Sequence, residues 1–239
     1  MIKSASKQTL KSLLGEPRYH DIQQQWRDFK GQLKNRWMYF YYTYIAKDKN
    51  HGYDRAFYEN IENFNTECYD LLARTIVAEF NPKKLVDVGC GSGGISLALM
   101  KAGCGEIVAF DYSLDAVKMA RSKGLPSVEQ IDLTQAETIP ARGDVCICLE
   151  VAEHLPESAA SKLCQLLSEA APNLVFTAAP PGQGGHLHLN EQPQSYWIEL
   201  MRSFSMTYDP EAVARMRQSF DGKMIRDYDD NLMIFRRSS

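Results

Sequence analysis

The sequence predicts an α/β fold, in which a helical N-terminal segment precedes a doubly wound, mostly parallel β-sheet. Two observations carry this prediction. Residues 1–80 show no clear strand pattern, and from residue 85 onward short apolar runs alternate with helical stretches. Alternation at this length is typical of parallel β-α-β units. We therefore expect two parts, a helical segment at residues 1–80 and one domain at residues 81–239.

The expected strands are short apolar runs. Four of the first five are almost continuously apolar, as strands that are buried on both faces must be. The sequence predicts strands at residues 85–89, 106–111, 127–132, 144–150, 173–179 and 232–237.

Helices are expected between these strands. Ser113 is a favourable N-cap for a helix that ends at Gly124, and the preceding helix ends at Gly103. Leu163, Leu166 and Leu167 share one stripe of a further helix. The expected helices span residues 95–103, 114–124, 157–170, 196–204 and 210–220.

The N-terminal segment combines positive charge with aromatic side chains. Residues 1–49 carry ten Lys or Arg and four Asp or Glu, which gives a local charge of +6. In residues 54–80 apolar side chains recur every three or four positions, which predicts an amphipathic helix. The aromatic run at residues 35–46 is too continuous for one helix face, so we expect it to be covered or to cover another part of the protein.

Composition argues against several classes of protein. The net charge is −3, whereas nucleic-acid binders are usually strongly basic. No apolar run approaches the roughly 18 residues of a membrane span, and the N-terminus lacks the apolar core of a secretory signal. The six cysteines form no C-x-x-C pair, so we expect buried, reduced thiols and a cytoplasmic location.

A glycine-rich loop follows the first expected strand, in the order Asp-Val-Gly-Cys-Gly-Ser-Gly-Gly at residues 87–94. Gly89, Gly91 and Gly94 fit the G-x-G-x-x-G pattern of dinucleotide sites. Asp87 would repel a pyrophosphate, but it would attract the ammonium group of a bound amino acid. Gly93 adds a glycine that lets the loop lie flat against an uncharged adenosyl group. These features favour S-adenosylmethionine (SAM) over NAD.

The second expected strand ends at Asp111, about 20 residues beyond the loop, where a carboxylate can accept hydrogen bonds from both ribose hydroxyls. Tyr112 would then lie beside the adenine. Because ligands of open α/β sheets bind at the carboxyl ends of the strands, both residues are expected at one site with the glycine loop.

The stretch LVDVGCGSGG resembles motif I of class I SAM-dependent methyltransferases, and the resemblance extends over residues 83–180. It implies a seven-stranded sheet with an antiparallel last strand, SAM as cofactor and S-adenosylhomocysteine (SAH) as product. It also implies that Asp132 and Leu133 meet the adenine, and that the E-V-x-E-H-L segment starting at Glu150 flanks the methionine arm. The expected cofactor residues are Asp87, Gly89, Cys90, Gly91, Gly93, Asp111, Tyr112, Asp132, Leu133, Glu150 and Val151.

Two further segments are expected to meet the methyl acceptor. His154 and His188 are candidate general bases, because the pKa of histidine lies near operating pH. His186 and Asn190 lie in the same polar, glycine-rich loop as His188, and loops of this kind often contact substrates. Each histidine has an alternative role in bracing its loop. Three histidines could also close on a metal ion, but no further pattern supports this, and the sequence predicts no metal site.

The aromatic run of the N-terminal segment has two interpretations. In one, residues 1–80 form a lid that closes the pocket and contributes Tyr41 and Tyr44 to substrate binding, because small-molecule pockets are mostly apolar and aromatic. In the other, the run is a helical core packed on the sheet. The positive charge either steers an acidic substrate or belongs to a solvated helix face.

The resemblance implies a SAM-dependent methyltransferase that methylates an O, N or C atom of a small molecule, either a natural product or a metabolite. The PGQGGHLHLNEQP stretch resembles a subset of small-molecule methyltransferases. The alternatives are an RNA or protein methyltransferase, a SAM-binding accessory subunit without turnover, and an NAD-linked oxidoreductase. We expect no membrane partner and no nucleic acid, and the oligomeric state is open.

Overall fold

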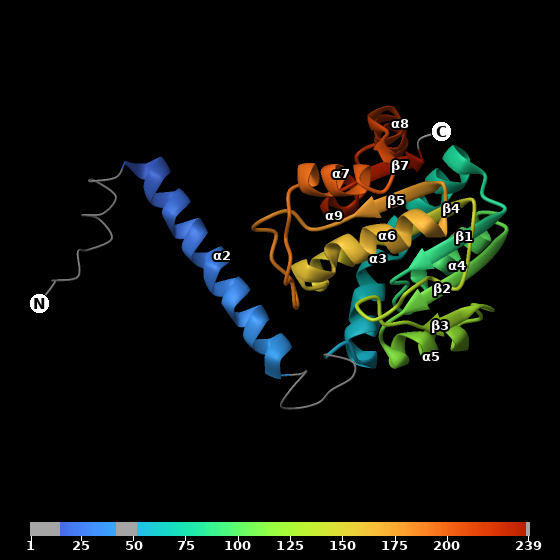
Figure 1. Ribbon diagram of the computed structural model, residues 1–239, viewed down its shortest axis with the longest axis horizontal. Coiled ribbons are helices and arrows are strands. Elements are labelled where there is room, and N and C mark those ends of the chain that lie inside the picture. Colours follow the sequence, from blue (N-terminus) through green and yellow to red (C-terminus); the bar gives the residue numbers. More distant parts are fainter. Residues whose placement is uncertain (1–14, 42–51, 238–239) are drawn as a thin grey trace, which may run out of the picture.

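The computed structural model describes residues 15–41 and 52–237 of the 239-residue chain. Its centre is a seven-stranded sheet in the order β3-β2-β1-β4-β5-β7-β6 (Figure 1). Strands β1 to β5 pair in parallel, whereas β7 is antiparallel to both of its neighbours. The predicted fold class is confirmed. The strands are β1 (Lys84–Val88), β2 (Glu106–Asp111), β3 (Val128–Gln130), β4 (Val145–Leu149), β5 (Asn173–Thr177), β6 (Met206–Tyr208) and β7 (Met233–Arg237).

All six predicted apolar runs are strands, with ends trimmed by a few residues. The strand that sequence patterns did not locate is β6, at the edge of the sheet beside β7. A strand of three residues is too short for a period of two to be recognised.

Helices cover both faces of the sheet and create two apolar cores. Leu85 and Val86 are consecutive in β1 and point into different cores, because side chains alternate along a strand. One face packs against α3 (Arg55–Phe80), α4 (Gly94–Lys101), α5 (Leu114–Ser122) and α8 (Pro210–Phe220). The other packs against α6 (Ala160–Ala170) and α7 (Gln194–Arg202). The short helices η2 (Ala152–His154), η3 (Glu157–Ala159) and α9 (Arg226–Asp229) lie in the connections of this domain.

Helix α3 begins at a cap and ends inside the core. The Asp54 side chain accepts a hydrogen bond from the backbone N–H of Phe57, which satisfies a free donor at the helix start. Toward the other end, Leu72, Ala73 and Ile76 are fully buried. The second half of α3 therefore belongs to the packed core, although the sequence pattern groups it with the N-terminal segment.

Helix α2 (Glu16–Phe40) lies beside the domain rather than in its core (Figure 1). Trp26, Trp37 and Phe40 are 59%, 62% and 50% exposed. Of the two expectations for the aromatic run, coverage does not hold for Trp37 and Phe40, because α2 is attached to the domain by a different side. Asn35, on that attached side, is buried. No helix in the described part of the chain is both long and apolar enough to cross a membrane.

Candidate functional site

A pocket lies at the carboxyl ends of the central strands, where the sequence predicts the cofactor site. Every predicted cofactor residue lines it except Gly93. The lining residues are Tyr39, Tyr53, Phe57, Tyr58, Tyr69, Asp87, Gly89, Cys90, Gly91, Ser92, Gly94, Ile95, Asp111, Tyr112, Ser113, Ile131, Asp132, Leu133, Thr134, Leu149, Glu150, Val151, His154, Leu155, Pro156 and Tyr228.

The glycine loop can take its path only without side chains. Gly89 has a φ of +84°, and its N–H donates to the carbonyl of Phe110 at 2.7 Å. A Cβ atom on Gly89 would collide with the Val151 side chain of the neighbouring loop. Gly93 has a φ of +85° at the start of α4, where a Cβ would come 3.0 Å from the Cβ of Ala120. Gly93 therefore lets the loop pack on α5 and does not line the pocket.

Two buried carboxyl groups stand at the tips of β1 and β2. Asp87 accepts a hydrogen bond of 2.6 Å from the hydroxyl of Ser96. Asp111 accepts from the N–H groups of Gly91 and Ser113, both at 2.8 Å. Burial raises the pKa of Asp87 to about 7 and that of Asp111 to about 6, although these hydrogen bonds act in the opposite direction.

The pocket is acidic. The described residues that line it include four acidic side chains, Asp87, Asp111, Asp132 and Glu150. No Lys or Arg is among these described lining residues. Carboxylates that lose water without gaining a cation are unfavourable, so the site is suited to a ligand with positive charge.

An aromatic wall from α3 and the residues just before it closes one side of the pocket. Tyr53, Phe57, Tyr58 and Tyr69 line it, and Tyr53 packs edge-on against Phe57 with ring centroids 4.9 Å apart. Sequence patterns did not reveal this wall, because the run at residues 35–46 is denser in aromatic side chains. The four-residue spacing of Tyr53 and Phe57 was the available signal.

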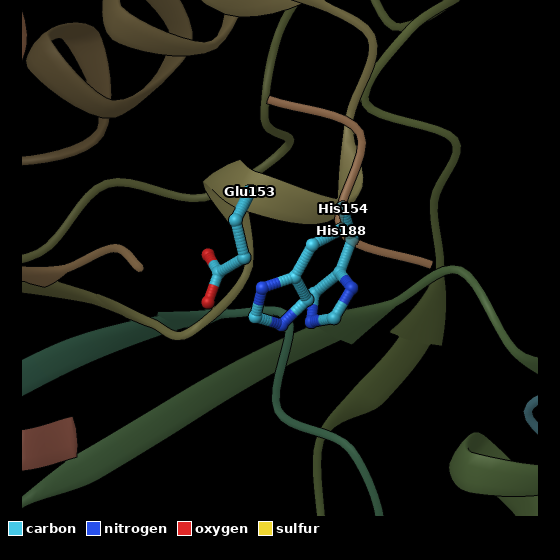
Figure 2. Close-up of side chains that lie close together, drawn as sticks. All are labelled: Glu153, His154 and His188. Carbon is cyan, nitrogen blue, oxygen red and sulfur yellow. The ribbon is translucent and has the colours of Figure 1, made fainter. Parts of the chain in front are cut away.

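The two candidate bases lie next to each other, but only His154 lines the pocket. Its Nδ1 is 2.9 Å from the hydroxyl of Tyr53. Burial and, to a smaller extent, the neighbouring His188 lower the pKa of His154 to about 3, so the ring is neutral. His188 is buried behind it, with ring centroids 4.9 Å apart and Nδ1 2.9 Å from a carboxylate oxygen of Glu191 (Figure 2).

Glu153 joins these two histidines. One ligand atom from each of Glu153, His154 and His188 lies within 4.8 Å of the other two (Figure 2). Burial and the neighbouring carboxyl group of Glu150 raise the pKa of Glu153. Among the described residues, one carboxylate and two imidazoles here form a set that could hold a metal ion. The sequence places Glu153 in the E-V-x-E-H-L segment but gives it no role of its own.

Three of the four predicted substrate residues, Tyr41, His186 and Asn190, are described by the structure, and none of them lines the pocket. His186 packs edge-on against Tyr53, with ring centroids 5.2 Å apart. Asn190 is buried and accepts a hydrogen bond from Gln192. Tyr41 is 38% exposed and stacks on Trp37. Tyr44 lies outside the described residues.

Known proteins resemble the central part of the chain. A family model described as a methyltransferase domain matches residues 86–171. The ubiquinone biosynthesis O-methyltransferase of Idiomarina loihiensis is 40% identical over 81 residues, which are 31% of this chain and 33% of that protein. The protein of the same name from Azotobacter vinelandii is 32% identical over 125 residues, half of each chain. The chain thus spans a third to a half of the length of these curated relatives.

Solved structures resemble the whole fold. Magnesium protoporphyrin IX methyltransferase from Synechocystis, with bound SAM, covers 83% of this chain and 94% of its own with a TM-score of 0.57 and 19% identity. An O-methyltransferase family protein from Burkholderia thailandensis covers 91% of this chain and 71% of its own, with a TM-score of 0.61 and 13% identity. At such identities these likenesses establish the fold alone.

Proposed function

We propose that this chain, which carries a class I SAM-dependent methyltransferase domain, transfers the methyl group of SAM to a small molecule, with a hydroxyl group as the preferred acceptor. The observation that carries the proposal is the acidic pocket at the glycine loop, which has no Lys or Arg among its described lining residues. SAM brings an ammonium and a sulfonium, both cationic. The pyrophosphate of NAD would bring negative charge to the same carboxylates.

Each part of SAM has a proposed partner. Asp87 accepts from the ammonium group, and Asp111, beside the loop amide of Gly91, accepts from the ribose hydroxyls. Asp132 and Leu133 meet the adenine, with Tyr112 beside them. Cys90 and the glycines shape the loop, and Glu150 and Val151 flank the methionine arm.

The transfer itself needs alignment more than acid chemistry. The acceptor oxygen attacks the methyl carbon, the carbon–sulfur bond breaks, and the sulfonium becomes the neutral thioether of SAH. Alignment of the three reacting atoms can lower the barrier by about 7–11 kcal/mol. The hydroxyl proton must leave, and the neutral ring of His154 at the pocket wall is the proposed acceptor, with His188 holding that ring in place.

A planar, hydroxylated acceptor fits the rest of the pocket. The edge-to-face rings of Tyr53 and Phe57 offer an apolar wall beside His154. The name ubiquinone biosynthesis O-methyltransferase of the partial relatives supports an oxygen acceptor on such a ring.

The N-terminal segment is the proposed lid of this site. The Asn35 side chain of α2 donates to the carbonyls of Gly185 and His188 at 3.1 and 3.2 Å, and Tyr39 lines the pocket. Once the lid closes, we expect four residues to contact the acceptor. These are Tyr41 and Tyr44 of the N-terminal segment, and His186 and Asn190 of the histidine loop. The six cysteines, none in a disulfide, support a reducing compartment such as the cytoplasm.

Calorimetric titration with SAM, SAH and NADH tests the cofactor. We expect saturable binding of SAM and SAH and none of NADH. Asp87→Asn keeps an acceptor for Ser96 but removes the charge, so SAM affinity should fall between about tenfold and 150-fold, the equivalent of about 1.5–3 kcal/mol for a charged hydrogen bond.

The matched control is Asp115→Asn, at a partly exposed carboxylate in α5. It should bind SAM as the wild type does. SAM with a labelled methyl group, incubated with a panel of phenols, then tests the transfer. NADH binding without SAM binding in folded protein would refute the proposal.

A further inference from the structure

A carboxyl group beside the acceptor side of the pocket is buried without compensation. The Glu153 side chain is 0% exposed, and neither of its oxygen atoms makes a hydrogen bond among the described residues. Its backbone carbonyl, in contrast, accepts from the N–H groups of Leu189 and Asn190 at 2.7 and 3.0 Å. The backbone of Glu153 is therefore held by the histidine loop, while its carboxyl group is left without a hydrogen-bond partner.

Two histidine rings face this carboxyl group. Figure 2 shows the Glu153 carboxyl group beside the two rings, and the ligand atoms of the three residues lie within 4.8 Å of one another. We propose that Glu153, His154 and His188 bind a divalent transition-metal ion, with Zn²⁺ as the reference ion. Imidazole and carboxylate are ligands that this class of ion prefers. The binding itself is independent of the proposed function, and only its catalytic use rests on methyl transfer.

The hydrogen bonds of His188 prepare one ring nitrogen for a metal. Nδ1 lies 2.9 Å from Oε1 of Glu191, whose carboxylate also accepts from the N–H groups of Gly182 and Gly184 at 2.9 and 2.7 Å. An acceptor of three hydrogen bonds is ionised, so the proton of His188 stays on Nδ1. Its Nε2 then carries a free electron pair. A carboxylate behind the distal nitrogen is the usual support for a metal-binding histidine.

His154 is prepared in the same way. Its Nδ1 is 2.9 Å from the hydroxyl oxygen of Tyr53. That hydroxyl has one proton, which it donates to the carbonyl of His186 at 3.3 Å. In the tautomer that metal binding requires, this oxygen accepts from Nδ1–H of His154, and the electron pair of the ring is on Nε2. A single general base needs only one neutral ring with a free Nε2 atom, whereas this site has two.

The loop is shaped to admit the His188 ring. A Cβ atom on Gly185 would come within 2.6 Å of both Cδ2 and Cε1 of His188, so the glycine backbone lies over the face of the ring. Nε2 is the ring atom nearest to that added Cβ, so the absence of a side chain at residue 185 leaves room beside this nitrogen. Asn35 fixes the loop from outside through the carbonyls of Gly185 and His188.

A bound cation would balance the negative charge of the carboxylates at this site. It would supply the partner that the Glu153 carboxylate lacks, in a pocket whose described lining has acidic groups but no Lys or Arg. His154 reaches the pocket, so an ion on its Nε2 would have open positions toward an acceptor. A hydroxyl that coordinates such an ion loses its proton more readily, and the ion then activates the acceptor in place of the free imidazole.

Metal titration of the full chain, free of any histidine tag and stripped with a chelator, tests the site. We expect one Zn²⁺ per chain by calorimetry, and one Co²⁺ whose visible absorption reports nitrogen and oxygen ligands. Glu153→Gln, His154→Gln and His188→Gln should each weaken Zn²⁺ binding at least about a hundredfold. Absence of any binding to the wild type up to about 1 mM Zn²⁺ would overturn the proposal.

Two neighbouring variants serve as controls. Glu157→Gln changes an exposed carboxylate in the next turn, and His186→Gln changes a histidine of the same loop that is outside the ligand set. Both should bind Zn²⁺ as the wild type does. Loss of binding in His186→Gln with retention in His188→Gln would show that the ligand set is wrong. Circular dichroism checks each fold, and the wild-type Co²⁺ spectrum decides the matter if a ligand variant does not fold.

A parallel SAH titration separates this proposal from the methyltransferase proposal. SAH binding without metal binding overturns the metal site and leaves the proposed function standing. Metal binding without SAH binding has the reverse consequence, because the two sets of residues are different.

Discussion

The two halves of the pocket are built in different ways. The half proposed for SAM comes from consecutive strand tips, with Asp87 near the end of β1 and Asp111 at the end of β2, 24 positions apart in the sequence numbering. The half proposed for the acceptor joins segments that are far apart, since Tyr53, His154 and His188 come from three different loops. Local sequence motifs therefore describe the first half, whereas only the folded chain describes the second.

The largest expected effect is in the cofactor half. Gly89→Ala should reduce SAM affinity by at least about a hundredfold, because it combines a φ of +84° with a collision against Val151, and the loop must move to relieve both. Calorimetric titration with SAM measures the loss.

Gly103→Ala is the control for backbone strain alone. Gly103 has a φ of +93°, but nothing lies within 4 Å of an added Cβ, and it does not line the pocket. This variant should lose stability and keep its SAM affinity. Wild-type SAM affinity in a folded Gly89→Ala protein would show that the loop is not tied to the cofactor.

The same contrast explains how much the sequence predicts. Buried parallel strands have continuous apolar runs, so six of the seven strands follow from local patterns. The glycine loop and Asp111 follow from their spacing, whereas Asp132, Leu133, Glu150 and Val151 are implied by the family resemblance, and every predicted cofactor residue except Gly93 lines the pocket. The roles of Tyr53 and Glu153 could not be found in this way. The role of Tyr53 depends on a hydrogen bond across 101 positions, and that of Glu153 on the absence of any partner after burial.

The position of α2 also illustrates this limit. Its aromatic residues predict coverage on hydrophobicity alone. A polar residue, Asn35, helps to attach it by reaching the carbonyls of a loop 150 positions away. Nothing in the local pattern distinguishes Asn35 from the other polar residues of that helix.

An intermediate effect, on the free energy of unfolding, is expected in the acceptor half. Most substitutions destabilise a protein, whereas this one should stabilise it. Glu153→Met should stabilise the metal-free protein by about 1–3 kcal/mol, because an apolar side chain replaces a buried carboxyl group without a hydrogen bond. Urea unfolding in the presence of a chelator measures the change.

Glu157→Met, at an exposed position of the next turn, should leave the free energy of unfolding nearly unchanged. A destabilised Glu153→Met protein would mean that the carboxyl group contributes to the fold. The comparison between the halves would then fail, because Glu153 would be structural rather than functional.

The smallest expected effect is the pH dependence of SAM binding. The pKa of Asp87 is raised to about 7 in the ligand-free protein, and a cationic ligand requires the ionised form. SAM affinity should therefore rise by up to about tenfold between pH 6 and pH 8, with release of protons. Titrations in buffers of different ionisation enthalpy measure both quantities.

Asp87→Asn removes the titrating group, so the SAM affinity of this variant should change less with pH. The same shift has a consequence for stability. A carboxyl group that stays protonated in the folded state to about pH 7, but ionises near pH 4 when unfolded, favours folding less as the pH rises between these values. Ligand-free wild type should thus lose stability relative to Asp87→Asn over this range. An unchanged difference would place the Asp87 carboxylate in contact with water and remove the electrostatic basis of the cofactor half.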